Sequence, residues 1–540
     1  MFTKGIFTFI VAFGLLGQMA AAPAGDGTPH LERTGSLTRL MVDGQPFLML
    51  AGELHNSSSS SLDYMKPIWP KLAAMNLNTV LAPVSWELLE PEEGKFEFEL
   101  VDGLISAAKE NHLHLVFLWF GSWKNGVSSY APFWVKSDLT RFPRAQNRPG
   151  DNIDTLSTFG HATQEADAHA FAALMKHIRE VDGRDHTVLM MQVENEVGVL
   201  GSARDHSAQA DAAWNQPVPK ALLSYLVQHK DALIPEFAET WRKAGSKTSG
   251  TWSTVFGDTK RAEEIFMAWH YAQYIDAVAA AGKAEYPLPM YVNAWLIQYR
   301  GQPGGEHPSG GPVSRVLDVW RAGTSHIDFL SPDIYLSDFR GVLARYEHLG
   351  NPLFIPEARG QMVGGANALY AVGQGALGFS PFAIDSITGD ESLPRAYAVL
   401  QQLSPLLAKV SKGQIASVVQ QAGETKAAVE LGGYELEVNY QDRRREPTAP
   451  AANAVPAAAL IINSGSNEFI VAGQGMTITF AANSAGAPLV GLSQVDEGSF
   501  ADGKWVPGRR LNGDETNGEN FMILRHGSPA IQRVRLYRHE

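Results

Sequence analysis

Two apolar runs of the sequence end in glutamates, which are residues capable of acid–base and nucleophilic chemistry. The first run ends in Gln192–Glu196 (QVENE), and the second ends in Ile355–Glu357 (IPE). A pair of carboxyl groups facing each other can protonate a leaving oxygen and attack an anomeric carbon. One glutamate at the end of a strand is usually an ion-pair partner, but an Asn-Glu pair with a second, distant glutamate is more specific. We therefore predict that Glu196 and Glu357 form such a pair.

Glu194 and Glu196 compete for the role of the acid. Regular alternation along a strand would place both side chains on one face. Gly198 follows closely, so the strand ends here and the alternation is expected to fail by Glu196. We assign the acid/base role to Glu196. The amide of Asn195 then lies beside it, where it can bond the sugar hydroxyl next to the anomeric carbon.

The elements that must position these residues are short apolar runs separated by helical patterns. Continuous apolar runs are typical of strands buried on both faces, as in parallel sheets. They predict an α/β fold, a (β/α)8 TIM barrel, whose strand C-termini carry the active site. A doubly wound sheet would need a glycine-rich phosphate loop after its first strand, and GELHNSSSSS is not one. The eight runs cover residues 49–52, 79–84, 113–120, 187–193, 290–295, 327–330, 353–356 and 376–382.

The pattern divides the chain into three parts. Residues 1–24 are expected to be a signal peptide, and residues 30–410 the barrel. The barrel begins with a hairpin that turns at Asp43-Gly44 and is expected to close the barrel floor, and it contains a long insertion at about 198–288. From 411 to 540 the runs alternate with period two, which predicts a C-terminal β-sandwich domain. Residues 447–459 are expected to be a loop in this domain.

Composition excludes several classes of protein. Of the 540 residues 45% are hydrophobic and the net charge is −13, so the chain is neither disordered nor suited to nucleic acid. Cysteine is absent, which excludes disulfide scaffolds, thiolate metal sites and cysteine nucleophiles. The signal peptide predicts secretion, with the periplasm as the destination in a Gram-negative bacterium. No later run is long enough to span a membrane, so no membrane partner is expected after cleavage.

Further polar and aromatic residues at predicted strand ends are candidates for substrate binding. Glu53, His55 and Asn56 follow the first strand, and His55 is equally compatible with a sugar ligand and with a satisfied core histidine. Trp119 and Trp295 end the third and fifth strands. Each is expected either to be a stacking platform for a sugar or to pack in the core, and the same holds for Trp123.

The serines of 57–61 are expected to form a tight loop that caps a helix starting near Ser61. His112 and His114 share one face of the third strand but lie at its start, away from the catalytic end. Neither an H-E-x-x-H motif nor a G-x-S-x-G motif is present. We therefore expect neither a metal nor a cofactor.

The segment QVENEVG at 192–198 resembles the acid/base segment of glycoside hydrolase family 35, the β-galactosidases of clan A. The stretch from Asn78 through Trp86 to GKFEF resembles the same family, and the likeness runs over about 48–360. It implies that Glu196 is the acid/base, that Glu357 is the nucleophile, and that Asn195, Tyr335 and Trp86 contact the substrate or the nucleophile. The all-β tail resembles the accessory domain of a bacterial branch of this family.

Two strands depart from the family pattern, which affects the expected sugar. Many members have a tyrosine-rich second strand and a CAEW-like third strand, whereas this chain has LAPVSW and FLWFGSW. The resemblance predicts a secreted, retaining exo-β-galactosidase that acts on oligosaccharides such as xyloglucan-type plant fragments. It leaves open whether the protein is a homodimer. The alternatives are an endo-glycanase or β-arabinopyranosidase on the same machinery, a non-catalytic carbohydrate-binding barrel, and a metal-dependent barrel isomerase.

Overall fold

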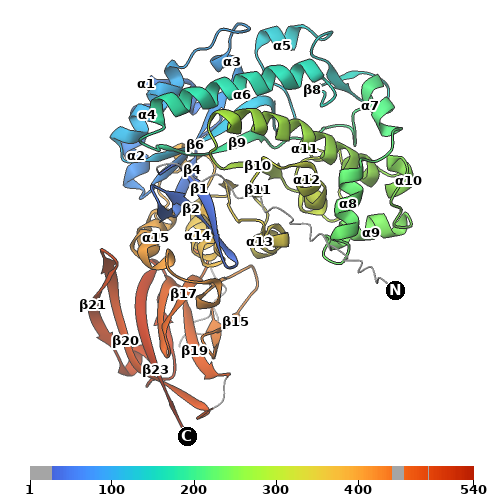
Figure 1. Cartoon of the computed structure of the whole chain (residues 1–540). Helices are drawn as coiled ribbons and strands as arrows, with labels where there is room; N and C mark the ends of the chain where they lie inside the picture. Colours follow the sequence, from blue (N-terminus) through green and yellow to red (C-terminus); the bar gives the residue numbers. More distant parts are fainter. Residues whose placement is uncertain (1–26, 441–454, 484–485) are drawn as a thin grey trace, which may run out of the picture.

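A computed structural model describes residues 27–440, 455–483 and 486–540. The predicted signal peptide, most of the loop at 447–459 and the run Arg443–Arg445 lie outside these residues. The chain forms a parallel barrel surrounded by helices, with antiparallel sheets below it in the view of Figure 1. No helix in the described ranges is long and apolar enough to cross a membrane.

The barrel consists of eight parallel strands, as the apolar runs predict. Their order in the sheet is β12-β11-β10-β9-β6-β5-β4-β13, and a parallel bridge from Ile355 to Phe379 closes the ring. The sixth and seventh strands along the chain, β11 and β12, extend beyond their apolar runs, because their backbone hydrogen bonds continue into polar residues. The strands are β4 (Met49–Glu53), β5 (Thr79–Ser85), β6 (His114–Lys124), β9 (Val188–Asn195), β10 (Met290–Trp295), β11 (Phe329–Ile334), β12 (Glu357–Ala358) and β13 (Gly378–Phe379).

Helices cover the outside of the barrel, and alternate residues of each strand point to the two sides. In β6, Leu115, Phe117 and Trp119 pack in the large core between strands and helices. Val116 and Leu118 belong to a second core inside the barrel. The helices in the barrel part are α1 (Leu62–Met65), α2 (Trp69–Ala74), α3 (Trp86–Leu89), α4 (Glu99–Glu110), α5 (Phe133–Ser137), α6 (His161–Asp182), α11 (Lys260–Glu285), α12 (Leu317–Gly323), α13 (Phe339–Tyr346), α14 (Gly364–Gly373) and α15 (Ser392–Leu407).

The predicted hairpin is present and closes the floor of the barrel. Strands β2 (Leu37–Val42) and β3 (Gln45–Phe47) pair antiparallel around Asp43 and Gly44, whose φ angles of 51° and 71° are those of a tight hairpin turn. A further strand, β1 (His30–Thr34), extends this sheet. Leu40 and Val42 pack in the inner core of the barrel.

The insertion between β9 and β10 is shorter than the predicted 198–288. Helix α11 packs lengthwise against α6, so it belongs to the barrel's own outer layer (Figure 1). The inserted part therefore ends before Lys260. It holds α7 (Ala208–Trp214), α8 (Lys220–Gln228), α9 (Pro235–Lys243) and α10 (Trp252–Phe256). A small two-stranded sheet, β7 (Arg144–Gln146) with β8 (Asn152–Leu156), lies in the loop after β6.

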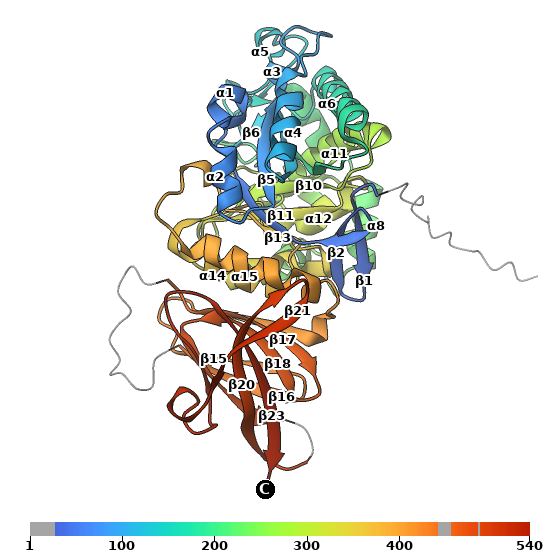
Figure 2. The same cartoon turned by 90° about the vertical axis from the view of Figure 1, so that its left-hand side faces the viewer.

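The C-terminal part is a β-sandwich, as the period-two pattern predicts. Two antiparallel sheets enclose a separate core that includes Leu436, Ile461 and Val534. The sandwich lies directly under α14 and α15 (Figure 2). One sheet holds β14 (Ile415–Val419), β17 (Ala458–Gly465), β18 (Glu468–Gln474), β20 (Leu489–Ala501), β21 (Lys504–Leu511) and β23 (Ala530–His539), and the other holds β15 (Lys426–Leu431), β16 (Tyr434–Asn439), β19 (Met476–Ala482) and β22 (Met522–Leu524).

Candidate active site

The ends of β9, β11 and β12 bring three carboxyl groups together. Glu196, Asp333 and Glu357 each offer an oxygen, and these oxygens lie within 4.8 Å of one another. Retaining glycosidases have catalytic carboxyl groups about 5–5.5 Å apart, and inverting ones about 6.5–9.5 Å. The approach of one oxygen of Glu196 to one of Glu357 within 4.8 Å is closer than the inverting range.

The backbone at the end of β9 separates Glu194 from Glu196. Both residues have positive φ angles, 62° and 44°, so the regular alternation of the strand is lost here. Glu194 accepts hydrogen bonds from the backbone N of Ser122 (3.0 Å) and of Trp123 (2.7 Å). It is fully buried beside Asp167, whose charge, after burial itself, raises the pKa of Glu194 well above its usual range. Glu194 thus anchors β6, and Glu196 is free to face Glu357.

A tight turn after β6 supplies two further contacts to the site. Lys124 and Val127 exchange backbone hydrogen bonds around Asn125 and Gly126, which have φ angles of 53° and 71°. This is the geometry of an Asn-Gly hairpin turn. The Lys124 Nζ donates to Asn195 Oδ1 at 2.9 Å, and Asn125 Nδ2 donates to Glu196 Oε2 at 2.6 Å.

Asn293, in β10, connects the acid strand to Asp333. Its Oδ1 accepts from the backbone N of Glu196 at 2.9 Å, and its Nδ2 donates to Asp333 Oδ2 at 2.8 Å. Burial, followed by the charges of Glu357, Glu196 and Glu53, raises the pKa of Asp333 well above its usual range. The neighbouring carboxylates thus disfavour the ionised form of Asp333.

Glu357 is bound by the hydroxyl of Tyr335, which follows the end of β11. The Tyr335 hydroxyl donates to Glu357 Oε1, and Glu357 Oε2 is buried without a hydrogen-bond partner. Arg359 is exposed and donates to the backbone carbonyl of Tyr335 at 3.1 Å.

Electrostatics distinguish the two glutamates. Burial, followed by the charge of Glu357, raises the pKa of Glu196 to about 7. Burial also raises the pKa of Glu357, while the Lys124 charge and the Tyr335 hydroxyl lower it. Lys124 and hydrogen-bond donors lower both pKa values, but the charge of the other glutamate raises only the pKa of Glu196. This difference favours a protonated Glu196 opposite an ionised Glu357.

The residues predicted after the first strand lie on the same side of the barrel. Glu53 is fully buried, and neither of its carboxyl oxygens has a hydrogen-bond partner among the residues that the structure describes. Burial, followed by the Glu357 charge, raises the pKa of Glu53 well above the usual range. His55 Nδ1 lies 3.0 Å from Asp385 Oδ1, and its side chain is 44% exposed, so it is not a core histidine. Asn56 is half-buried and lines a cavity of about 230 Å³ with Ser85.

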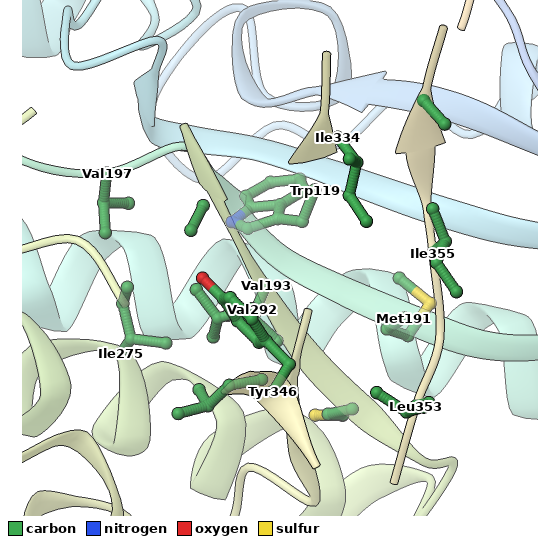
Figure 3. Close-up of a cluster of buried hydrophobic side chains, with 14 of the residues drawn as sticks. Trp119, Met191, Val193, Val197, Ile275, Val292, Ile334, Tyr346, Leu353 and Ile355 are labelled. Carbon is green, nitrogen blue, oxygen red and sulfur yellow. The ribbon is translucent and has the colours of Figure 1, made fainter. Parts of the chain in front are cut away.

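The tryptophans are placed differently from the expectation. Trp119 is fully buried among the helices, and its Nε1 donates to Asp167 at 2.9 Å (Figure 3). Trp86 is also fully buried and donates to Glu90 Oε2 at 2.8 Å. Neither can stack on a sugar, because both side chains pack in the large core between the strands and the helices. Trp123 is buried as well. Trp295 is half-buried at the end of β10 and remains a candidate platform.

Four residues of the site were not predicted: Lys124, Asn125, Asn293 and Asp333. The Asn125-Gly126 dipeptide directly after an apolar strand is a strong turn signal and could have indicated the first two. Asn293 is a polar residue within the apolar run 290–295, and Asp333 lies three residues beyond the end of the run 327–330. Such positions face either the barrel interior or the helices, and only the strand register decides which.

The same cluster is where a cation would fit best. Within the ranges that the structure describes, Glu196, Asp333 and Glu357 are the group of acidic or histidine side chains close enough to share one. All of these ligands are carboxylate oxygens, a set that suits hard cations such as Mg²⁺ and Ca²⁺. The absence of a metal therefore remains a prediction, which removal of metal ions can test.

An eight-stranded barrel with two facing carboxyl groups at its strand ends has the fold and site of the glycoside hydrolase class. Residues 39–239 match the family model "Glycosyl hydrolases family 35", and residues 393–522 match "Domain of unknown function (DUF5597)". The family 35 match covers less than half of the chain, and the DUF5597 match follows it towards the C-terminus. Glu196 lies inside the family 35 match and Glu357 outside it, so the geometry alone pairs them.

Two curated relatives are similar to about a third of this chain. A β-galactosidase of Xanthomonas manihotis is 27% identical over 206 residues, which are 36% of this chain and 31% of that protein. Beta-galactosidase 14 of Arabidopsis thaliana is 22% identical over 188 residues, which are 33% of this chain and 19% of that protein. The aligned segment spans less than a third of either relative.

A solved structure shares the fold over nearly the whole chain. Gan42B, a GH42 β-galactosidase from G., superposes with a TM-score of 0.50 over 94% of this chain and 100% of its own. The two sequences are 11% identical, so this likeness shows the fold alone. It agrees with the barrel and the following antiparallel sheets described above.

Proposed function

We propose that this protein is a retaining exo-β-galactosidase that removes terminal β-galactosyl residues from oligosaccharides. The observation that carries the proposal is the approach of the Glu196 and Glu357 carboxyl oxygens to within 4.8 Å at the ends of opposing barrel strands. The β-galactosidase segment at 39–239, which contains Glu196, supports the choice of sugar.

The site supports a double displacement. Glu196, whose pKa is raised to about 7, protonates the glycosidic oxygen while Glu357 attacks the anomeric carbon. The aglycone leaves and a glycosyl-enzyme forms on Glu357. Glu196 then takes a proton from water, which attacks the same carbon and releases the sugar with its configuration retained. Tyr335 holds the Glu357 carboxylate throughout.

Several buried polar atoms without partners are suited to bind sugar hydroxyls. They include both Glu53 oxygens, Asn195 Nδ2 and Asp333 Oδ1. Leaving such atoms unpaired costs about 1–3 kcal/mol each, which a bound sugar would recover. Together with the unusual second and third strands, they would set the specificity, for which plant xyloglucan-type fragments are our proposal. We further propose that the protein is secreted to the periplasm, on the basis of residues 1–24.

Hydrolysis of 4-nitrophenyl β-galactoside tests this function. We expect release of nitrophenol by the wild-type protein, unchanged after dialysis against EDTA, and not by Glu357→Gln. Loss of activity with EDTA would indicate that the three carboxylates bind a required metal. Cleavage of a nitrophenyl β-arabinopyranoside in preference to the galactoside would favour the β-arabinopyranosidase alternative, and inactivity on all glycosides would favour a binding protein.

A further inference from the structure

Lys124 is a buried cation in the centre of the candidate site. Its residue is 5% exposed, and its Nζ lies 5.1 Å from the centroid of the Phe120 ring. Its charge lowers the pKa of Glu53, Glu196 and Glu357, so it lies within electrostatic reach of all three. Within the described residues, however, its Nζ hydrogen bond goes to a neutral amide, Asn195 Oδ1, at 2.9 Å. Burying a charge is costly unless it is paired, so a lysine that bonds a neutral amide although carboxylates lie nearby requires an explanation.

We propose that Lys124 is a positioning residue that fixes the Asn195 amide with its NH2 group toward the hydroxyl beside the anomeric carbon of the bound sugar. The inference rests on the proposed function, and it adds a specificity-determining residue to it.

The chemistry of the two side chains sets the direction of the amide. An ammonium group has three donors and no acceptor, so it can bond only the oxygen of Asn195. The Nδ2 group must then point away from Lys124. In the described structure Asn195 Nδ2 is buried and has no hydrogen-bond partner. It is thus a donor held ready for an acceptor that the protein itself does not supply.

The backbone around Lys124 makes this orientation rigid. Lys124 is the last residue of β6, pairs in register with Asn195, and precedes the Asn125-Gly126 turn. The backbone N of Asn125 also donates to the carbonyl of Asn195 at 3.2 Å. Both the main chain and the amide of Asn195 are therefore bound to the same turn. A donor preorganised in this way stabilises charge that develops in the transition state without reorganisation.

The experiment compares a galactoside with an analogue that lacks the relevant hydroxyl. The substrates are 4-nitrophenyl β-D-galactoside and its 2-deoxy analogue, and the variants are Lys124→Met, Asn195→Ala and the double variant. Lys243→Met makes the same change on an exposed face of α9 and is the control. Each protein is measured across the pH range, because loss of the Lys124 charge also raises the pKa of nearby carboxyls.

We expect Lys124→Met to lower kcat/KM on the galactoside by about 10²-fold at its own pH optimum, the loss typical of one preorganised donor. Asn195→Ala should lose a similar factor, and the double variant should lose little more than either single one, because both remove one contact. On the 2-deoxy substrate the kcat/KM of Lys124→Met should differ from that of the wild type by only about threefold, a difference that loss of a nearby positive charge can cause by itself. Lys243→Met should match the wild type on both.

Equal losses on the two substrates, or multiplicative losses in the double variant, would show that Lys124 does not act through Asn195 and would overturn the inference alone. A wild-type protein inactive on both galactosides would overturn the proposed function and the inference with it. If Lys124→Met does not fold, Lys124→Gln carries the same test, since its shorter neutral side chain keeps a polar group in the space but ends one atom short of Asn195.

Discussion

At the residue scale, a single asparagine tunes the candidate acid. Asn125 donates to Glu196 Oε2, and this hydrogen bond lowers the pKa of Glu196 from a value that burial and Glu357 have raised. Activity requires a protonated Glu196 and must fall as the pH rises through its pKa, about 7. It requires an ionised Glu357 and must also fall as the pH drops through the pKa of that residue.

Asn125→Ala should therefore move the alkaline side of the kcat/KM profile to higher pH, by up to about one unit, because the ionised form of Glu196 loses a donor. The acid side should move less, since Asn125 does not touch Glu357. Asn147→Ala, which removes an exposed asparagine bound to Asp151, is the control. An alkaline side that moves to lower pH in Asn125→Ala would contradict the acid role of Glu196.

The two glutamates also differ in what an added anion can rescue. In Glu196→Ala a dinitrophenyl galactoside should still glycosylate Glu357, because that leaving group needs no proton, and azide should then release β-galactosyl azide. In Glu357→Gly azide can enter only from the vacated face, which gives the α-azide. On unactivated sugars Glu196→Ala should lose about 10²–10⁴-fold. The configuration of the azides, read by NMR, checks the assignment; the same anomer from both variants would show that the pair is misplaced.

At the scale of the elements, the end of β6 depends on a position that only glycine can fill. A Cβ on Gly121 would lie 2.3 Å from Trp119 Nε1 and 2.6 Å from Glu194 Oε1. Both atoms are held by hydrogen bonds, to Asp167 and to the backbone of β6 respectively, and cannot move aside freely. Glycine at this position therefore lets β6 approach Glu194 closely, and this approach places Lys124 and the turn after it at the site.

Gly121→Ala should lower the free energy of unfolding by about 1–3 kcal/mol, the usual effect of overpacking a rigid core, and should lower kcat as well. Gly413→Ala is the matched control, because a Cβ there meets no atom within 4 Å. Urea unfolding and steady-state kinetics measure the two effects. Equal stabilities of the two variants would mean that the region around Gly121 relaxes without strain.

The sequence predicts elements better than it predicts which side of an element a residue faces. The eight runs give the barrel and the period-two pattern gives the sandwich, because apolar burial sets both. Trp119 was misjudged because it lies one residue from Phe120, which faces the barrel interior, and the pattern of a strand buried on both faces does not tell the two sides apart. Asp333 was missed for the same reason. Glu196 and Glu357 could be predicted from their strand-end positions, irrespective of the side that each residue faces.

At the scale of the whole molecule, the outer core of the barrel extends into one face of the sandwich, beside the sandwich's own core. The large hydrophobic cluster that surrounds the barrel strands continues through Ile415, Leu460 and Ile462 of the sandwich. Helix α14 packs on β14 and β17, and the backbone N of Phe500 donates to Gln402 of α15 at 3.1 Å. The DUF5597 match at 393–522 likewise begins inside α15, ahead of the predicted boundary at 411. The last barrel helix therefore belongs to both parts.

This shared core predicts that the two parts unfold together. Eleven of the twelve tryptophans precede residue 411, so tryptophan fluorescence reports chiefly on the barrel. Ile462→Ala opens a cavity on the sandwich side of the shared core and should destabilise the protein by about 2–5 kcal/mol. It should lower both the temperature of the fluorescence transition and the temperature at which activity is lost, although Ile462 lies far from the site in sequence.

Val506→Ala, on an exposed part of β21, should leave both temperatures unchanged. If the fluorescence transition of Ile462→Ala matched that of the wild type while circular dichroism showed earlier loss of β-structure, the sandwich would unfold independently of the barrel.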